Sequence, residues 1–106
     1  MHNDKVSARE KVLNMVAECV CHDRNIAYGE PEDNFRLIAA LWTEYLMAKG
    51  LINAPLASED VAMLMCLLKI ARIATSVPKL DSYVDLAGYA VCGGAIINAK
   101  PQSAAE

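Results

Sequence analysis

The sequence lacks the features that mark several large classes of protein. Its 10 Lys and Arg are outnumbered by 13 Asp and Glu, so bulk charge does not favour strong binding to a nucleic-acid backbone. It has no Ser/Gly-rich linker and no internal repeat, and with 55% hydrophobic residues it does not have the composition of a disordered chain. With 106 residues, we expect one domain spanning 1–106.

Long hydrophobic runs are also missing. The most apolar stretch, 61–73, is interrupted by Lys69 and Arg72 and is shorter than the ~20 residues that span a bilayer. The first residues do not show the basic segment and apolar segment of a secretory signal. We therefore expect a cytoplasmic protein with no membrane partner.

The four cysteines do not form a metal-binding pattern. Cys19 and Cys21 are separated by one residue, and on a helix such neighbours point about 200° apart, so they cannot chelate one ion unless the helix breaks there. We expect no zinc site, although Cys19 shares a face with His22. In a reducing compartment Cys66 and Cys92, like the first two, are expected to be free thiols that pack as small hydrophobic side chains.

Start and stop signals divide the chain into four helical segments. Ser7 and Glu10 have the spacing of a capping box, which predicts a helix that ends near residue 23 or 24. Pro31 suits the first turn of a second helix, and Gly50 is its natural end. Ser58 is expected to cap a third helix.

A fourth helix is expected from Asp81, as its cap, to about residue 98, with Pro101 beyond it. The first two helices carry apolar stripes at helical spacing, and the third is apolar nearly all round, which predicts the most buried position. The stripes comprise Val12, Val16, Cys19 and Val20 in the first helix, and Phe35, Ile38, Trp42, Tyr45 and Leu46 in the second. No stretch alternates as a strand would. The sequence therefore predicts an all-α, antiparallel bundle of about four helices, with a core over 7–99 and a frayed tail over 100–106.

Four charged residues are expected to meet where the third and fourth helices form a hairpin. Lys69 and Arg72 lie near the end of one helix, and Asp81 and Asp85 lie one turn apart at the start of the next. Because unpaired charges among apolar side chains cost several kcal/mol, these groups must pair or bind a ligand. One interpretation is structural, with Asp81 as a cap and Asp85 as the ion-pair partner of Lys69 or Arg72.

The other interpretation is a ligand site. Asp81 and Asp85, with Asp60 as a weaker candidate, would supply oxygen ligands to Mg²⁺, and Lys69 and Arg72 would contact phosphate. Mg²⁺ commonly uses one or two protein carboxylates together with water and phosphate oxygens. Three further residues are expected near the mouth of this site: Arg24, Tyr28 and Asn34.

Several sequence words then resemble a known family. They are DRNIAYGEPEDNF (23–35), IAALW (38–42), DVAMLM (60–65), LKIAR (68–72) and DSYVDLAGYA (81–90). Together they resemble small all-helical proteins of phages and prophages with no assigned activity, over about residues 9–95. The resemblance implies a phage-encoded protein that works in the cytoplasm of a bacterial host.

That family is in turn distantly similar to nucleotide-modification-associated domains and to MazG-like all-α nucleoside-triphosphate pyrophosphohydrolases. Those enzymes are dimers or tetramers, and they hold Mg²⁺ on helical Glu and Asp residues to activate a water molecule that cleaves between the α- and β-phosphates. Their Glu-Glu-x-x-Glu word is absent here, and Asp81 and Asp85 are spaced by four residues instead of three. The resemblance therefore implies nucleotide or phosphate binding more directly than catalysis.

Three functions follow as hypotheses. The first is a protein that binds a nucleotide or another phosphate-bearing molecule, with Mg²⁺-dependent pyrophosphohydrolysis as its enzymatic form. The second is a non-catalytic protein that sequesters a nucleotide signal, and the third is a structural or protein-interaction module with no small ligand. Because a small bundle with this much apolar surface exceeds what one core can bury, we also expect a homo-oligomer.

Overall fold

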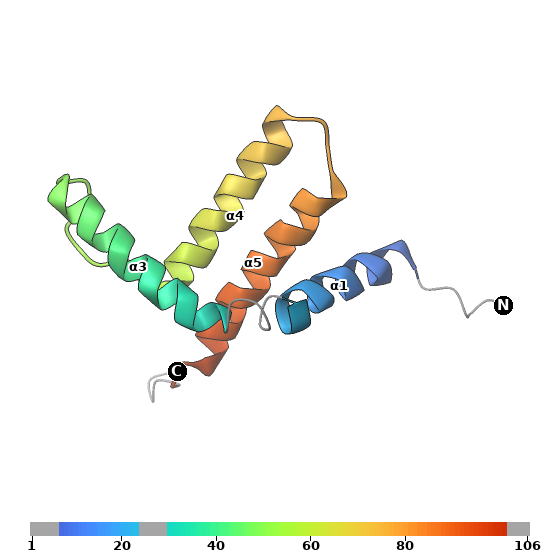
Figure 1. Cartoon of the computed structure of the whole chain (residues 1–106), viewed down its shortest axis with the longest axis horizontal. Helices are drawn as coiled ribbons and strands as arrows, with labels where there is room; N and C mark the ends of the chain where they lie inside the picture. The colour runs from blue at the N-terminus through green and yellow to red at the C-terminus, as the bar shows by residue number, and fades with distance from the viewer. Residues whose placement is uncertain (1–6, 24–29, 102–106) are drawn as a thin grey trace.

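The computed structural model of the protein describes residues 7–23 and 30–101, which are almost entirely helical. Along the chain the elements are α1 (Ala8–Glu18), the short π-helix η2 (Cys19–Asp23), α3 (Pro31–Ala48), α4 (Ser58–Thr75) and α5 (Leu80–Ala99) (Figure 1). These two ranges contain no strand. The all-α prediction and the expected order of four main helices are confirmed, whereas residues 102–106 of the expected tail lie outside the described part.

The predicted start of the first helix and both predicted boundaries of the second are confirmed in detail. The Ser7 hydroxyl accepts the N–H of Glu10, and the Glu10 carboxylate accepts the N–H of Ser7, so both halves of the capping box form. Pro31 occupies the first turn of α3. Two residues after α3 ends, Gly50 has φ +73°, a left-handed conformation that a residue without Cβ adopts at little cost.

The predicted caps of the last two helices are wrong by one or two residues. Ser58 is the first residue of α4, and the cap position belongs to Ala57, whose N–H donates to the Asp60 carboxylate at 2.8 Å. Asp81 is the second residue of α5, which Lys79 precedes as the cap. In both helices the acidic residue lies inside the first turn, where it still interacts favourably with the helix dipole.

Helices α4 and α5 form an antiparallel hairpin, and α1 and α3 diverge from it on opposite sides (Figure 1). α3 packs against both hairpin helices, and α1 packs against α5. The hairpin helices approach closely because Gly93 has no side chain: a Cβ there would lie 3.1 Å from the Cβ of Ala62. Gly88 likewise makes room for Val20 of η2, whose Cγ1 would lie 3.0 Å from an added Cβ.

The core lies where all five elements meet, and it is small. Its buried members are mostly short side chains: Val16, Val20, Phe35, Ala39, Val61, Ala62, Val84, Cys92 and Ile96. The predicted stripe of α1 contributes as expected, but Tyr45 of the α3 stripe is 63% exposed. The expectation that α4 is the most buried helix is also wrong, since Met63 and Leu67 are exposed and α5 has more buried residues. The sequence pattern identifies apolar helix faces, but it does not show whether another part of the same chain packs against each of them.

Candidate functional site

The predicted contact between the hairpin helices is present as an ion pair. Lys69 Nζ on α4 lies 2.9 Å from Asp85 Oδ2 on α5, and the two side chains are 16% and 28% exposed. Lys69 is eleven residues into α4, and Asp85 follows the start of α5 by one turn, so the antiparallel arrangement brings them level. The pair is therefore held by both helices and partly removed from water.

The other two members of the predicted cluster do not join this pair. The side chains of Arg72 and Asp81 are exposed and form no hydrogen bond or ion pair within residues 7–23 and 30–101. Arg72 lies almost one turn beyond Lys69, and Asp81 lies one turn before Asp85. The prediction that all four charges meet in an apolar setting is thus correct for Lys69 and Asp85 only. The side chains of Arg72 and Asp81 are exposed to solvent.

The remaining predicted residues fall in three different places. Asn34, which is half-buried, precedes Phe35, whose ring lies 6.2 Å from that of Tyr89. Tyr89 lies one turn after Asp85 on α5, so the start of α3 lies about one turn from Asp85. Asn34 is therefore near the predicted ligand site, as expected. Arg24 and Tyr28 lie outside the described residues.

Asp60 does not belong to this cluster. It lies nine residues before Lys69 on α4, or about 14 Å along the helix axis. Its carboxylate accepts the N–H of Ala57, which stabilises the start of α4. Consistent with this separation, the described residues contain no group of three or more His, Cys, Asp or Glu side chains that could hold a metal ion.

A groove lies at the opposite end of the hairpin, and no sequence pattern pointed to it directly. It encloses about 680 Å³ between α3, the segment that leads into α4, and the end of α5. Thr43 forms part of its wall by accepting the N–H of Leu56 at 2.9 Å, which holds the returning loop against α3. Its other polar lining residues are Arg36, Glu44, Ser58, Glu59 and Lys100.

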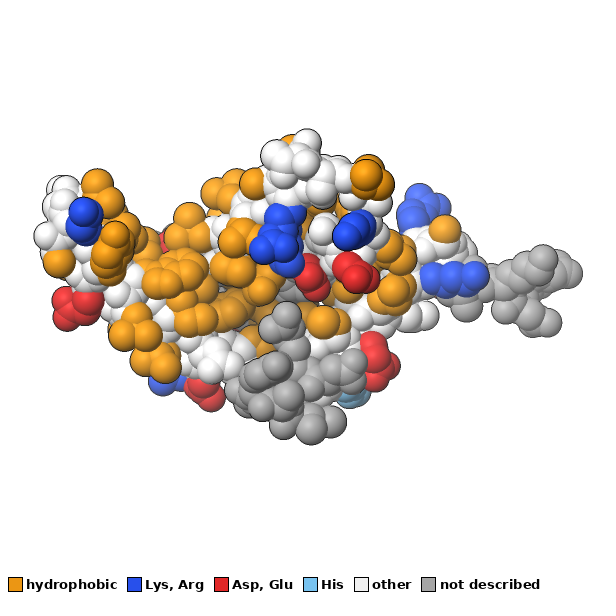
Figure 2. Space-filling model, turned by 45° about the horizontal axis from the view of Figure 1, so that its top comes forward, with side chains coloured by type: hydrophobic (Ala, Val, Ile, Leu, Met, Phe, Trp, Pro, Cys, Tyr) orange, Lys and Arg blue, Asp and Glu red, His pale blue; other side chains and the backbone are white. Residues whose placement is uncertain are grey.

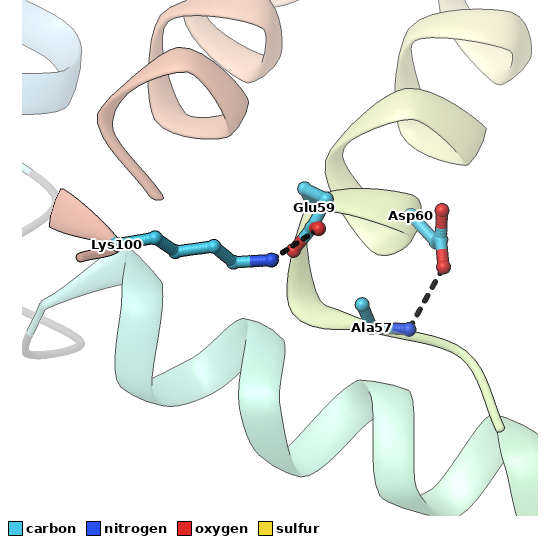
Figure 3. Close-up of polar contacts among 4 residues, drawn as sticks. All are labelled: Ala57, Glu59, Asp60 and Lys100. Carbon is cyan, nitrogen blue, oxygen red and sulfur yellow. Dashed lines mark hydrogen bonds and ion pairs between the residues drawn. The ribbon is translucent and has the colours of Figure 1, made fainter. Parts of the chain in front are cut away.

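Glu59 is the most constrained acid in this groove. Figure 3 shows Lys100, just after α5, reaching across to the Glu59 carboxylate, with which it forms an ion pair. The hydrogen bond from Lys100 lowers the pKa of Glu59 below its ordinary value of about 4.5. The second carboxylate oxygen is buried with no hydrogen-bond partner. The contact links residues 41 positions apart, so its partner could not be identified from local spacing.

The cysteines agree with the predicted thiols. None of the four forms a disulfide, and Cys66 and Cys92 are buried. The Cys66 Sγ lies 3.6 Å from the Leu86 carbonyl, and burial raises the pKa of the thiol. Cys21, in contrast, is exposed, so the packing role expected for it is wrong.

Comparison with known proteins places the chain in a family. Residues 11–97 match the model of a domain of unknown function, DUF6378. The chain belongs to this family. The Gene 55 protein of Mycobacterium phage D29 is 39% identical over 83 residues, which are 78% of this chain and 51% of that protein. The Gene 55 protein of Mycobacterium phage L5 is 39% identical over 79 residues, or 74% and 47%.

The DUF6378 chain spans about half the length of these curated phage relatives, and neither relative's name states an activity. No solved structure matches it. The expected resemblance to a phage family of unassigned activity is therefore confirmed, while the further likeness to MazG-like enzymes finds no support in these matches. Within the described part of the chain, no helix is both long enough and apolar enough to cross a membrane.

Proposed function

We propose that this phage-family protein binds a phosphate-bearing small molecule, of which nucleotides are the first class to test, beside the Lys69–Asp85 ion pair. The observation that supports the proposal is the neighbourhood of that pair: Arg72 adds an exposed guanidinium almost one turn along α4. A guanidinium presents several donors in a plane, which suits the oxygens of a phosphate group. A phosphate that contacts Arg72 could also draw Lys69 away from Asp85.

Mg²⁺ belongs to this proposal only together with the ligand. Asp81 and Asp85 lie on one face of α5, one turn apart, and a released Asp85 could join Asp81 in holding the ion. Two carboxylates are a sparse protein site, so water and phosphate oxygens would have to complete the coordination. Pyrophosphohydrolysis is the narrower form of the hypothesis, and the shortage of acidic ligands makes binding without turnover the better supported form.

Thermal unfolding in the presence of ATP, pyrophosphate or inorganic phosphate, with and without Mg²⁺, tests this proposal. A ligand at 100 times its Kd adds about 2.7 kcal/mol to the free energy of unfolding. Arg72→Gln should abolish the ligand-induced shift, while Arg36→Gln, which removes the same charge from α3, should preserve it. Pyrophosphate release from nucleoside triphosphates tests the enzymatic form. The proposal fails if none of the three ligands shifts the transition.

A protein-interaction module is a second candidate, favoured by a different observation. The described residues leave 17 large hydrophobic side chains exposed. Monomeric proteins seldom expose contiguous apolar patches of more than about 300–600 Å². A phage protein with such a surface is suited to assembly with another protein, and the cytoplasm of the bacterial host remains the predicted location.

A further inference from the structure

The chain leaves most of its large hydrophobic side chains uncovered. Not one of its eleven leucines is buried, whereas eight of the ten buried hydrophobic residues are alanine, cysteine or valine. Bringing apolar surface out of water is the main driving force for folding and association. A sequence this rich in leucine therefore has a second apolar surface that the described fold leaves uncovered.

Part of that surface is one side of α4. Met63, Leu67 and Ile70 follow each other at four and three residues, which places them in one row along the helix. Leu64 and Leu68 form an adjacent row. All five side chains are exposed, and no charged residue occurs between 61 and 68. The one charge within the segment, Lys69, lies between Leu68 and Ile70 and pairs with Asp85 on α5.

The second part is a row on α3. Leu37, Leu41 and Tyr45 repeat every four residues and are each about 60% exposed. They lie away from Phe35 and Ala39, which are the buried residues of this helix. Figure 2 shows hydrophobic side chains gathered over α3 and α4 on one face of the molecule. We call the eight residues of these rows the α3–α4 face.

We propose that the α3–α4 face is covered by the same face of a second copy of the chain, so that the protein is a two-fold symmetric homodimer. Eight side chains of this size at about half exposure present on the order of 800 Å², which matches what each partner contributes to a standard protein interface. This amount exceeds the largest apolar patch of a typical monomer, about 300–600 Å². The area is thus what a stable dimer needs.

The chemistry of the face favours a second copy over a polar partner. In a two-fold dimer, each residue of the patch meets the same patch on the other subunit. Charged residues in that patch would meet like charges, but none of its eight residues is charged. The net charge of −3 therefore comes from other residues of the chain, and contacts between these eight side chains and their symmetry mates bring no charges together.

Charge substitution combined with mass measurement tests the proposal. Leu41→Glu on α3 and Leu67→Glu on α4 each place a carboxylate in the interface twice, once from each subunit. Each should weaken self-association by at least about 100-fold, measured by light scattering over a dilution series. Leu13→Glu is the matched control, because Leu13 on α1 is at least as exposed as Leu41 and Leu67 but lies outside the α3–α4 face. It should leave the dimer intact, and circular dichroism should show that all three variants are helical.

Photo-crosslinking keeps the proposal testable if a glutamate variant does not fold. p-Benzoylphenylalanine at position 45 replaces an exposed aromatic side chain with another, so the fold should be retained. It should link two copies, with the attachment site in residues 37–45 or 63–70 of the second copy, and the same probe at position 13 should not. A monomeric mass at all concentrations would overturn the proposal. So would crosslinks that map outside these residues, or capture of the face by phospholipid vesicles instead of by a second copy.

Discussion

At the scale of single residues, the Lys69–Asp85 pair is the contact on which both interpretations of the charged cluster depend. The two groups are neither fully buried nor fully exposed, so desolvation and attraction are both moderate. The pair can hold the hairpin together in the free protein. In a ligand complex the same lysine would contact phosphate.

Asp85→Asn should lower the free energy of unfolding by about 1–2 kcal/mol, because it leaves a partly buried ammonium without its carboxylate. Asp81→Asn removes the same charge from an exposed position on the same helix and should change the free energy of unfolding by no more than about 0.5 kcal/mol. Urea unfolding measures both. Equal effects of the two variants would show that the ion pair does not stabilise the hairpin.

Glu59 should make stability depend on pH. The hydrogen bond from Lys100 lowers its pKa below about 4.5 in the folded state, so the unfolded chain takes up the proton more readily. The contribution of Glu59 is therefore present above about pH 4.5 and is lost as the pH falls through the folded-state pKa. Both Glu59→Gln and Lys100→Met should reduce the loss of stability on acidification, measured by urea unfolding at several pH values. An unchanged acid dependence in both variants would contradict the assignment.

Individual contacts were predictable where local spacing determines them. The capping box of α1 and the turn at Gly50 depend on residues three or four apart, and the Lys69–Asp85 pair depends on a short hairpin. The Glu59–Lys100 pair joins distant parts of the chain and could not be predicted in this way. Asp60 was only a weak candidate for the metal site, and its carboxylate accepts the N–H of Ala57 at the start of α4 instead.

At the scale of helices, glycine decides how closely α4 and α5 pack. Gly93 and Gly94 are neighbours on α5 but differ in surroundings. An added Cβ would lie 3.1 Å from Ala62 at position 93 and would have nothing within 4 Å at position 94. The Cβ of Ala62 is fixed to the α4 backbone, so it cannot rotate away from a new methyl group.

Gly94→Ala should therefore raise the free energy of unfolding by about 0.5–1 kcal/mol, because alanine favours the helix and restricts the unfolded chain. Gly93→Ala makes the same chemical change one residue earlier, but it should lower the free energy of unfolding by about 1 kcal/mol or more, as the two helices must move apart. Thermal or urea unfolding compares them. A stabilising Gly93→Ala would show that the hairpin packs less closely than described.

The helices themselves were predicted well because their ends carry chemical signals. Pro31 and the acids after it mark the start of α3, and the capping box marks the start of α1. The predicted N-terminal caps of α4 and α5 were less accurate, since several residues near each start can occupy the cap position. The direction in which α3 leaves the hairpin depends on tertiary contacts, such as the hydrogen bond from Leu56 to Thr43. Hydrophobic periodicity does not predict such contacts.

At the scale of the whole molecule, the main open feature is the exposed apolar surface of α3 and α4. The sequence pattern predicted an inward stripe on α3 and a buried α4, but it could not separate apolar residues that meet within one chain from those left uncovered by it. From α3 and α4 the core of the single chain takes mainly the start of α3 and the first half of α4, which leaves the α3–α4 face uncovered. A dimer gives that face a partner and explains why so many leucines are exposed in one copy.

The mass of the unmodified protein in solution tests this account most directly. Sedimentation equilibrium over micromolar to millimolar protein should give about 23 kDa, twice the 11.5 kDa of one chain, with dissociation only on dilution. A mass of 11.5 kDa throughout that range would contradict the account, because the α3–α4 face would then be exposed to water in the working protein.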